Sequence, residues 1–325
     1  MVSASVVTAF AFVCAALMGL AVQRGGTCAV AAVEEVVVHR DSRRFRALAE
    51  AAFWSAGLMA LAFLIFGKAI PARAFGVTEW TVFGGVLLGL GAWINGACVF
   101  GSVAAFGAGD WAYGFFPMGF ALGCYQFDAV GGRLGLTLPV PQGASTVFLT
   151  VVPLLALLFC GWLVLRVRHL QVAVARRAQE QTTWDVLRGE WPLHVGTIVV
   201  SVAFVAMALT YGHWVYTDAV AEVARGETAP TDSRLWLFGA MLLGSLGGGI
   251  SLRKWRPVAP SPGAIAKCLL GGWVMAFGFL LVPGANDSII LLGLPTLQPQ
   301  AWVAMVVMCL TLALLIVAKR RWWRA

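Results

Sequence analysis

The chain has 325 residues, of which 60% are hydrophobic and only 12% are charged, and its mean hydropathy is +0.84. Soluble domains carry about 25% charged residues, so this composition excludes an ordinary soluble protein and predicts an all-α integral membrane protein in contact with lipids. The formal net charge is +8, but the basic residues form short clusters between apolar runs, as in cytoplasmic loops. Binding to nucleic acid is therefore not expected.

Apolar segments follow one another along the chain, and nine of them are long enough to cross or nearly cross a bilayer, which takes about 20 residues. They lie near residues 3–22, 49–67, 82–97, 114–126, 146–166, 196–213, 234–251, 268–284 and 300–317. The first segment begins without the basic start and small-residue cleavage site of a secretory signal, so we expect it to be retained. Four further segments follow glycine-containing breaks and are too short to span the bilayer; these lie near residues 28–38, 98–106, 215–224 and 286–294.

A polar stretch divides the chain into two halves. Residues 167–195 are rich in Arg, Gln and Glu, and we interpret them as a cytoplasmic connection. The N-terminal half then comprises residues 1–166 and the C-terminal half residues 196–325. Each half contains spans and two of the short segments, which predicts an internal repeat.

Glycine positions support that repeat. With an offset of 187 residues, Gly91 falls on Gly278 and Cys98 falls on Ala285 without a gap. Internal repeats of this kind are common in transporter folds. The basic cluster HRDSRRFR in the first half has a nearly balanced counterpart in the second half, whereas RKWR in the second half has only a mildly basic counterpart in the first.

Because basic loops lie inside, equivalent loops of the two halves lie on opposite faces, so the repeats are inverted and form an hourglass-like bundle. Nine spans then place the N-terminus in the periplasm and the basic tail KRRWWR in the cytoplasm.

The four breaks suggest a path for a solute. They are QRGGTC, INGACVFG, TYGHWVYTD and VPGANDSIILLGLP, and inverted repeats bring them toward the middle of the bilayer. Backbone that is not helical is tolerated there only inside protein or beside a wet cavity. The N-terminus of a helix carries about half a positive charge, so such ends favour a small anion.

Two of the seven cysteines lie where a short segment begins, namely Cys28 and Cys98. The other five fall inside apolar runs, and we expect them to pack as small buried hydrophobes. A thiol at a helix N-terminus is a stronger donor, which favours contact of Cys28 and Cys98 with a solute. The spacing predicts neither a disulfide framework nor a zinc site, and no motif for a cofactor or for a catalytic triad occurs, so no metal or cofactor is expected.

The stretches "QRGGTC", "GGVLLGLGAWINGACVFG" and "LLGGWVMAFGFLLVPGANDSIILLGLP" resemble the YeeE/YedE sulfur-transport family, over essentially the whole chain. The resemblance implies uptake of thiosulfate across the bacterial inner membrane, with three central cysteines that pass the ion along by weak S–H···S contacts. Cys28 and Cys98 match the first two. Where the third is expected, this chain has Ala285 between Gly284 and Asn286. The resemblance also implies a small cytosolic TusA-like sulfur-carrier protein as a partner.

Several polar residues near the breaks have two interpretations. Arg24 either attracts an anion or extends to the membrane interface as an anchor. Asn95 either caps the break or turns its amide to the solute. We expect Glu34 or Glu35 to pair with an arginine at the cytoplasmic mouth, and Asp287 to cap a helix start. The predicted path residues are Arg24, Gly26, Cys28, Asn95, Gly96, Cys98, Gly284, Ala285 and Asn286.

Two other functions stay open at this point. In the first, the protein is a membrane-embedded sulfurtransfer or redox protein in which Cys28 or Cys98 carries a persulfide, although no general base accompanies these thiols. In the second, the replacement of the third thiol by Ala285 marks a regulatory paralogue that has kept the fold and does not transport.

Overall fold

The computed structural model describes residues 4–67, 73–144, 146–177, 191–229, 232–253 and 255–322. Almost all of its regular structure is helical, as the composition predicts. Its longer helices are α1 (Ala4–Gly25), α3 (Arg43–Phe66), α4 (Glu79–Asn95), α6 (Phe116–Arg133), α7 (Thr146–Arg177), α9 (Leu193–Thr210), α11 (Ser233–Ser251), α12 (Pro262–Leu281) and α14 (Pro299–Trp322).

The shorter elements lie at the predicted breaks. The short α-helices are α2 (Ala29–Glu34), α5 (Val99–Gly107), α10 (Tyr216–Ala224) and α13 (Asn286–Ser288). The π-helical turns η1 (Glu35–His39) and η3 (Ile289–Gly293) extend α2 and α13, and the 3₁₀ turn η2 (Trp111–Phe115) precedes α6. All four short α-helices begin within one residue of the predicted position, so this part of the prediction is confirmed.

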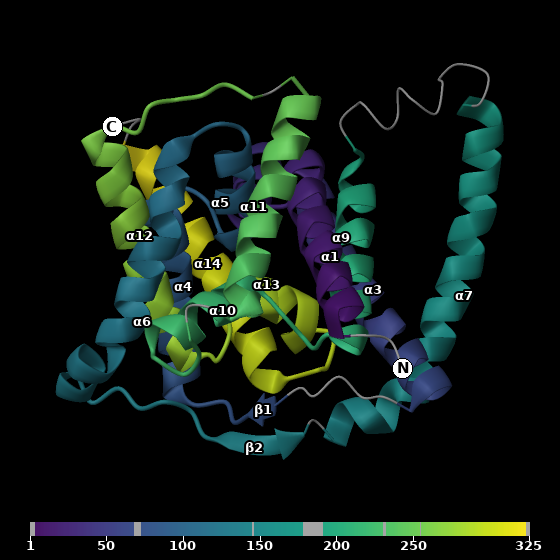
Figure 1. Cartoon of the computed structure of the whole chain (residues 1–325), viewed down its shortest axis with the longest axis horizontal. Coiled ribbons are helices and arrows are strands. Elements are labelled where there is room, and N and C mark those ends of the chain that lie inside the picture. The colour runs from purple at the N-terminus through teal and green to yellow at the C-terminus, as the bar shows by residue number, and fades with distance from the viewer. Residues whose placement is uncertain are drawn as a thin grey trace.

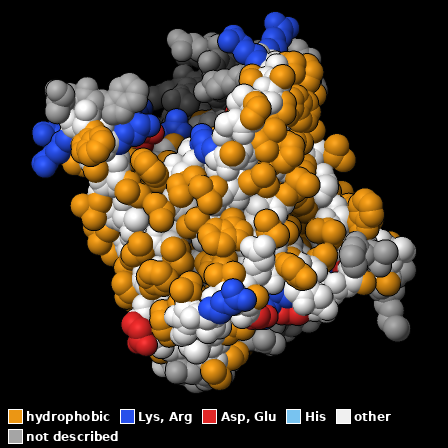
Figure 2. Space-filling view, turned by 90° about the vertical axis from the view of Figure 1, so that its left-hand side faces the viewer, with side chains coloured by type: hydrophobic (Ala, Val, Ile, Leu, Met, Phe, Trp, Pro, Cys, Tyr) orange, Lys and Arg blue, Asp and Glu red, His pale blue; other side chains and the backbone are white. Residues whose placement is uncertain are grey.

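Seven segments of the described chain are long and apolar enough to cross a membrane, and they contain α1, α3, α4, α7, α9, α12 and α14. Helix α6 carries Asp128 and Arg133, and α11 is rich in glycine and serine, so both are less apolar. The predicted count of nine spans therefore stays a prediction. Figure 2 shows a broad band of hydrophobic side chains between charged rims, which is the surface that a bilayer requires. The chain is a multi-pass membrane protein.

The long helices pack in a limited set of pairs. Helix α1 packs on α11 and α9, α4 packs on α12 and α14, α12 packs on α6, and α3 packs on α9. Helix α7 stands at the edge of the bundle and contacts α3 (Figure 1). The face that carries the start of α1 and the strands is opposite to the face on which α14 ends (Figure 1).

Glycines allow α4 and α12 to approach closely. A Cβ atom at Gly278 would lie 2.7 Å from the carbonyl oxygen of Gly84, and a Cβ atom at Gly91 would lie 2.7 Å from the carbonyl oxygen of Gly271. Small residues allow such approach of membrane helices. Under the 187-residue offset, Gly84 corresponds to Gly271 and Gly91 corresponds to Gly278.

Two features lie outside the predicted pattern. The strands β1 (Arg73–Phe75) and β2 (Pro141–Ala144) pair in an antiparallel fashion at one face, and segments this short leave no periodic pattern in a sequence. Of the predicted connection 167–195, residues 178–190 lie outside the described part of the chain, while residues 167–177 continue α7.

Candidate functional site

The four short helices start alike. Their N-cap residues are Cys28, Cys98, Val215 and Ala285, each in an extended backbone conformation and none with a side-chain capping bond. The dihedral angles of Cys98 (φ −77°, ψ −179°) nearly match those of Ala285 (φ −88°, ψ −178°). Since none of these N-cap side chains binds its own helix, N–H groups at the helix starts can bind partners from other helices.

Cys28 and Cys98, at the starts of α2 and α5, lie beside each other. The backbone N–H of Ala29 donates to the Cys98 Sγ at 3.1 Å, so the first N–H of α2 is capped by the residue that begins α5. Gly101 provides the space for Cys28, because a Cβ atom there would lie 2.5 Å from its Sγ. Cys98 is fully buried and Cys28 is partly buried.

Asn286 joins the second half of the chain to this pair of thiols. Its Oδ1 accepts a hydrogen bond from the Val99 N–H at 3.2 Å, so it caps α5 in the way that Cys98 caps α2. Its Nδ2 is buried and has no hydrogen-bond partner among the described residues. A buried donor without a partner costs about 1–3 kcal/mol, so this amide is an available hydrogen-bond donor at the start of α13.

Two more links close the cluster. The Tyr216 hydroxyl, at the start of α10, donates to the Val99 carbonyl oxygen at 3.1 Å. The Thr217 hydroxyl donates to both carboxylate oxygens of Asp287 at 2.9 Å, and Asp287 also accepts the Ser288 N–H at 2.9 Å. The N-terminal ends of all four short helices thus meet in one buried network, which we call the junction. Asp287 binds an N–H at a helix start, as predicted, and in addition the hydroxyl of Thr217.

The second break is held by Asn95. Its Nδ2 donates to the Ala97 carbonyl oxygen at 2.7 Å and to the Ser102 hydroxyl at 2.8 Å. The amide of Asn95 therefore binds the backbone and Ser102 within the break, which favours the capping role over contact with the solute. Gly96 has a φ of 76° and ends α4 in the left-handed conformation, which suits a residue without a Cβ atom.

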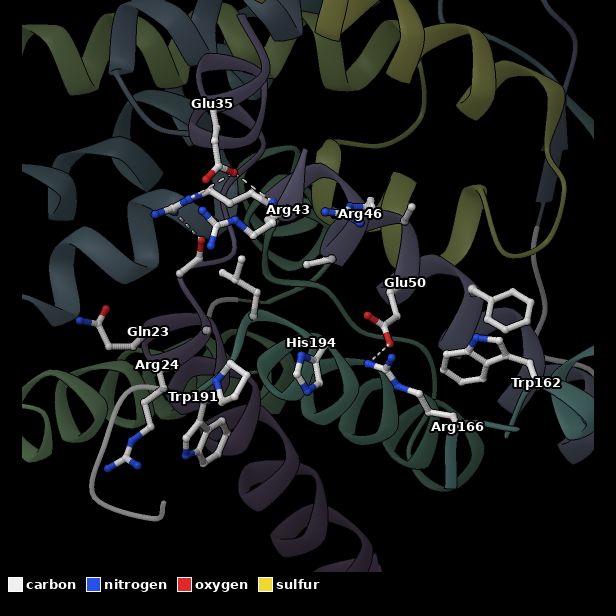
Figure 3. A pocket seen from close by; sticks show the side chains of 18 residues that line it. Gln23, Arg24, Glu35, Arg43, Arg46, Glu50, Trp162, Arg166, Trp191 and His194 are labelled. Carbon is white, nitrogen blue, oxygen red and sulfur yellow. Dashed lines mark hydrogen bonds and ion pairs between the residues drawn. The ribbon is translucent and has the colours of Figure 1, made fainter. Parts of the chain in front are cut away.

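A basic cavity of about 1000 Å³, the arginine vestibule, opens at the end of α1 (Figure 3). Its described lining contains five arginines, two glutamates and one histidine: Arg24, Arg43, Arg44, Arg46, Arg166, Glu35, Glu50 and His194. Gly26 also lies in its wall. The vestibule thus reaches to within two residues of Cys28.

Arg24 lies in this vestibule and not at the junction. Its side chain is only 8% exposed; it donates to the Ser251 hydroxyl at 2.7 Å and stacks over Trp191 with 5.4 Å to the ring centroid. Arg44 pairs with Glu35 at 3.9 Å, as predicted for this mouth, and donates to the carbonyl oxygen of Gly26 at 3.2 Å.

A second cavity, of about 590 Å³, approaches the junction from the side of α13. Its wall includes His213, Asp218, Glu222, Arg234 and Ser288. Ser288 is two residues from Asn286, so the two cavities flank the junction, one at Gly26 and the other at Ser288. Gly284, with a φ of 155°, forms the break that precedes Ala285 and Asn286, both fully buried.

Lys267 was not predicted as a member of the site. A Cβ atom at Gly96 would lie 2.8 Å from the Lys267 Nζ, so this ammonium group adds a positive charge beside the second break. The only signal in the sequence is one lysine at the edge of an apolar run, which by itself is typical of an anchor at the interface.

The other five cysteines are not among the residues that form the junction. Cys14, Cys124 and Cys268 are buried and Cys309 is partly buried, as expected of small hydrophobes, but Cys160 is exposed on α7. The prediction for Cys160 is therefore wrong, because α7 packs with only one side against the bundle. The described residues contain no group of three or more His, Cys, Asp or Glu that could hold a metal ion.

Comparison with known proteins identifies a family for this chain. The sequence profile of the family described as "Sulphur transport" matches residues 24–314. None of the curated proteins matches the chain significantly. The matched range includes the N-cap residues of all four short helices and the two cavities that flank the junction.

Proposed function

Because the chain belongs to the sulphur transport family, we propose that it takes up thiosulfate, or a related small sulfur anion, across the bacterial inner membrane. The observation that carries this proposal is the hydrogen bond from the Ala29 N–H, next to Cys28, to the Cys98 Sγ, in a junction flanked by two cavities. In this proposal the anion enters through the second cavity and leaves through the arginine vestibule on the opposite side of the junction.

The junction offers an anion several weak donors at once. These are the two thiols and the Asn286 Nδ2, supported by the positive ends of the short helices. Burying an uncompensated charge costs tens of kcal/mol in an idealised apolar medium, whereas one hydrogen bond contributes about 1 kcal/mol net. Passage therefore depends on donors acting together, and this is how a path with Ala285 in place of a third thiol remains workable.

The proposal includes two inverted repeats, and several contacts support them. Val99 and Asn286 are hydrogen-bonded and stand 187 residues apart, as expected for equivalent residues beside a two-fold axis. Likewise, the pair Gly91–Gly271 corresponds to the pair Gly278–Gly84 under the same offset. Residues 1–166 and 196–325 are then the two repeats, joined by 167–195.

We propose that α1 begins in the periplasm and α14 ends in the cytoplasm. The arginine vestibule and the basic end of α14, with Lys319, Arg320 and Arg321, support this orientation through the preference of basic residues for the inside. The basic cytoplasmic face, which also carries Arg253 and Arg256, offers a docking surface for a TusA-like sulfur-carrier protein.

Uptake of radiolabelled thiosulfate into proteoliposomes or whole cells tests the proposal. We expect Cys98→Ala to lower the initial rate about tenfold, since a lost contact to a charged group costs about 1.4 kcal/mol or more. The matched control is Cys124→Ala, which removes a buried thiol outside the junction. Wild-type uptake by Cys98→Ala at equal protein level would exclude the thiols from the path.

The position of Cys28 beside Cys98 also supports a second candidate, a membrane-embedded sulfurtransfer protein with a persulfide on Cys28 or Cys98. That function predicts a covalent adduct on one of these residues after exposure to thiosulfate, seen as a mass shift. A third candidate, a regulatory paralogue, predicts that neither wild type nor Ala285→Cys supports uptake although both insert correctly. Transport predicts uptake by the wild type and no lasting adduct.

A further inference from the structure

An apolar groove of about 770 Å³ runs beside the arginine vestibule. Its walls come mainly from α3, the turn after η3 and α14, and apart from Ser42 its described lining residues are apolar. Ala49 and Phe53 lie in the walls of both cavities. The arginine vestibule and the apolar groove therefore adjoin each other along α3.

The arginine vestibule contains more arginines than its two glutamates can neutralise. Glu35 pairs with Arg44, with 3.9 Å between Oε2 and Nε. Glu50 pairs with Arg166, with 3.5 Å between Oε1 and Nη2. Arg43 is hydrogen-bonded to Asp41 and thereby holds the pKa of that carboxyl below its usual range.

Arg46 also lines the arginine vestibule. Its side chain is exposed and forms no salt bridge with a described residue. It stands next in the chain to Phe45, whose ring lines the apolar groove. A guanidinium group and an apolar wall thus lie side by side at the start of α3.

We propose that an anionic phospholipid occupies this composite site. Its phosphate binds at Arg46, because guanidinium groups match phosphate geometry, and one acyl chain lies along the groove past Ala52 and Ala56. Basic pockets between membrane helices on the cytoplasmic side bind anionic head groups. A free anion would use the vestibule alone and leave the apolar groove uncovered, so the shared wall favours the lipid.

Native mass spectrometry of the full chain, released from membranes containing phosphatidylglycerol and phosphatidylcholine, tests this inference. We expect the wild type to retain phosphatidylglycerol preferentially. Arg46→Gln should lower this retention about fivefold, the effect of one basic residue at an anionic lipid. Arg321→Gln, a charge-matched change at the exposed end of α14, should leave it unchanged.

A second variant separates a lipid from a free anion. Ala52→Phe fills the groove and leaves every arginine in place, so it should lower retention of phosphatidylglycerol without changing the binding of inorganic phosphate. Equal retention by wild type, Arg46→Gln and Ala52→Phe overturns the inference. Displacement of the lipid by inorganic phosphate alone, or a dimer of this chain without bound lipid, overturns it as well. None of these outcomes depends on thiosulfate uptake.

Discussion

Asn286 has two polar atoms with different surroundings. Its Oδ1 caps α5 through the Val99 N–H, whereas its Nδ2 is buried without a partner among the described residues. A side chain fixed through one atom and free at the other is suited to hold a passing anion in a defined place. The two atoms also allow the structural and the transport roles to be tested separately.

Two substitutions at this position separate those roles. Asn286→Ala removes both atoms, so we expect a loss of about 1 kcal/mol in stability, typical of a lost helix cap, together with reduced thiosulfate uptake. Asn286→Asp keeps an acceptor for Val99 but replaces the donor by an anionic oxygen, so it should recover part of the lost stability without recovering uptake. Thermal unfolding in detergent and an uptake assay measure the two effects. Uptake by Asn286→Asp at the wild-type rate would show that the amide donor is not used.

Sequence patterns predicted the position of Cys28 and Cys98 but not their partners. A thiol that directly follows a break in an apolar run is visible in the sequence. The bond from Ala29 to Cys98 and the contact of Lys267 with Gly96 join residues that are far apart in the chain. Such contacts depend on how the helices cross, which no local pattern records.

At the scale of elements, glycine has two uses in this protein. In the breaks it ends helices, and the four short helices were predicted from it. Within α4 and α12 it lets the two helix backbones come close together. The same glycines, which recur 187 residues apart, predicted the internal repeat. The strands β1 and β2 escaped prediction because each has only three or four residues.

The contact between α4 and α12 predicts the effect of adding one methyl group. In Gly91→Ala the new Cβ would meet the Gly271 carbonyl oxygen at 2.7 Å, so we expect overpacking to cost about 1–3 kcal/mol and to lower the melting temperature. The matched control is Gly239→Ala in α11, where a Cβ atom meets nothing within 4 Å. There the better helix propensity of alanine should preserve or raise stability. Equal melting temperatures of the two variants would contradict the close packing of α4 and α12.

At the scale of the whole molecule, the arrangement of charge predicts its orientation. The start of α1 and the end of α14 lie on opposite faces (Figure 1), and the basic clusters lie mainly with the end of α14. A green fluorescent protein fused after the C-terminus should fluoresce, because it folds in the cytoplasm. A phosphatase that works only in the periplasm should be active when fused before α1. The reverse pair of results would invert the proposed direction of the vestibule.

The junction also determines how the protein behaves at rest. Cys98 and Asn286 are fully buried, so the proposed path is closed at these two residues in this structure. The seal consists of a few weak bonds between helix ends, each contributing about 1 kcal/mol net, rather than a thick hydrophobic plug. Because Cys98 is buried, the rate at which a thiol-reactive reagent modifies it would therefore measure how often the junction opens.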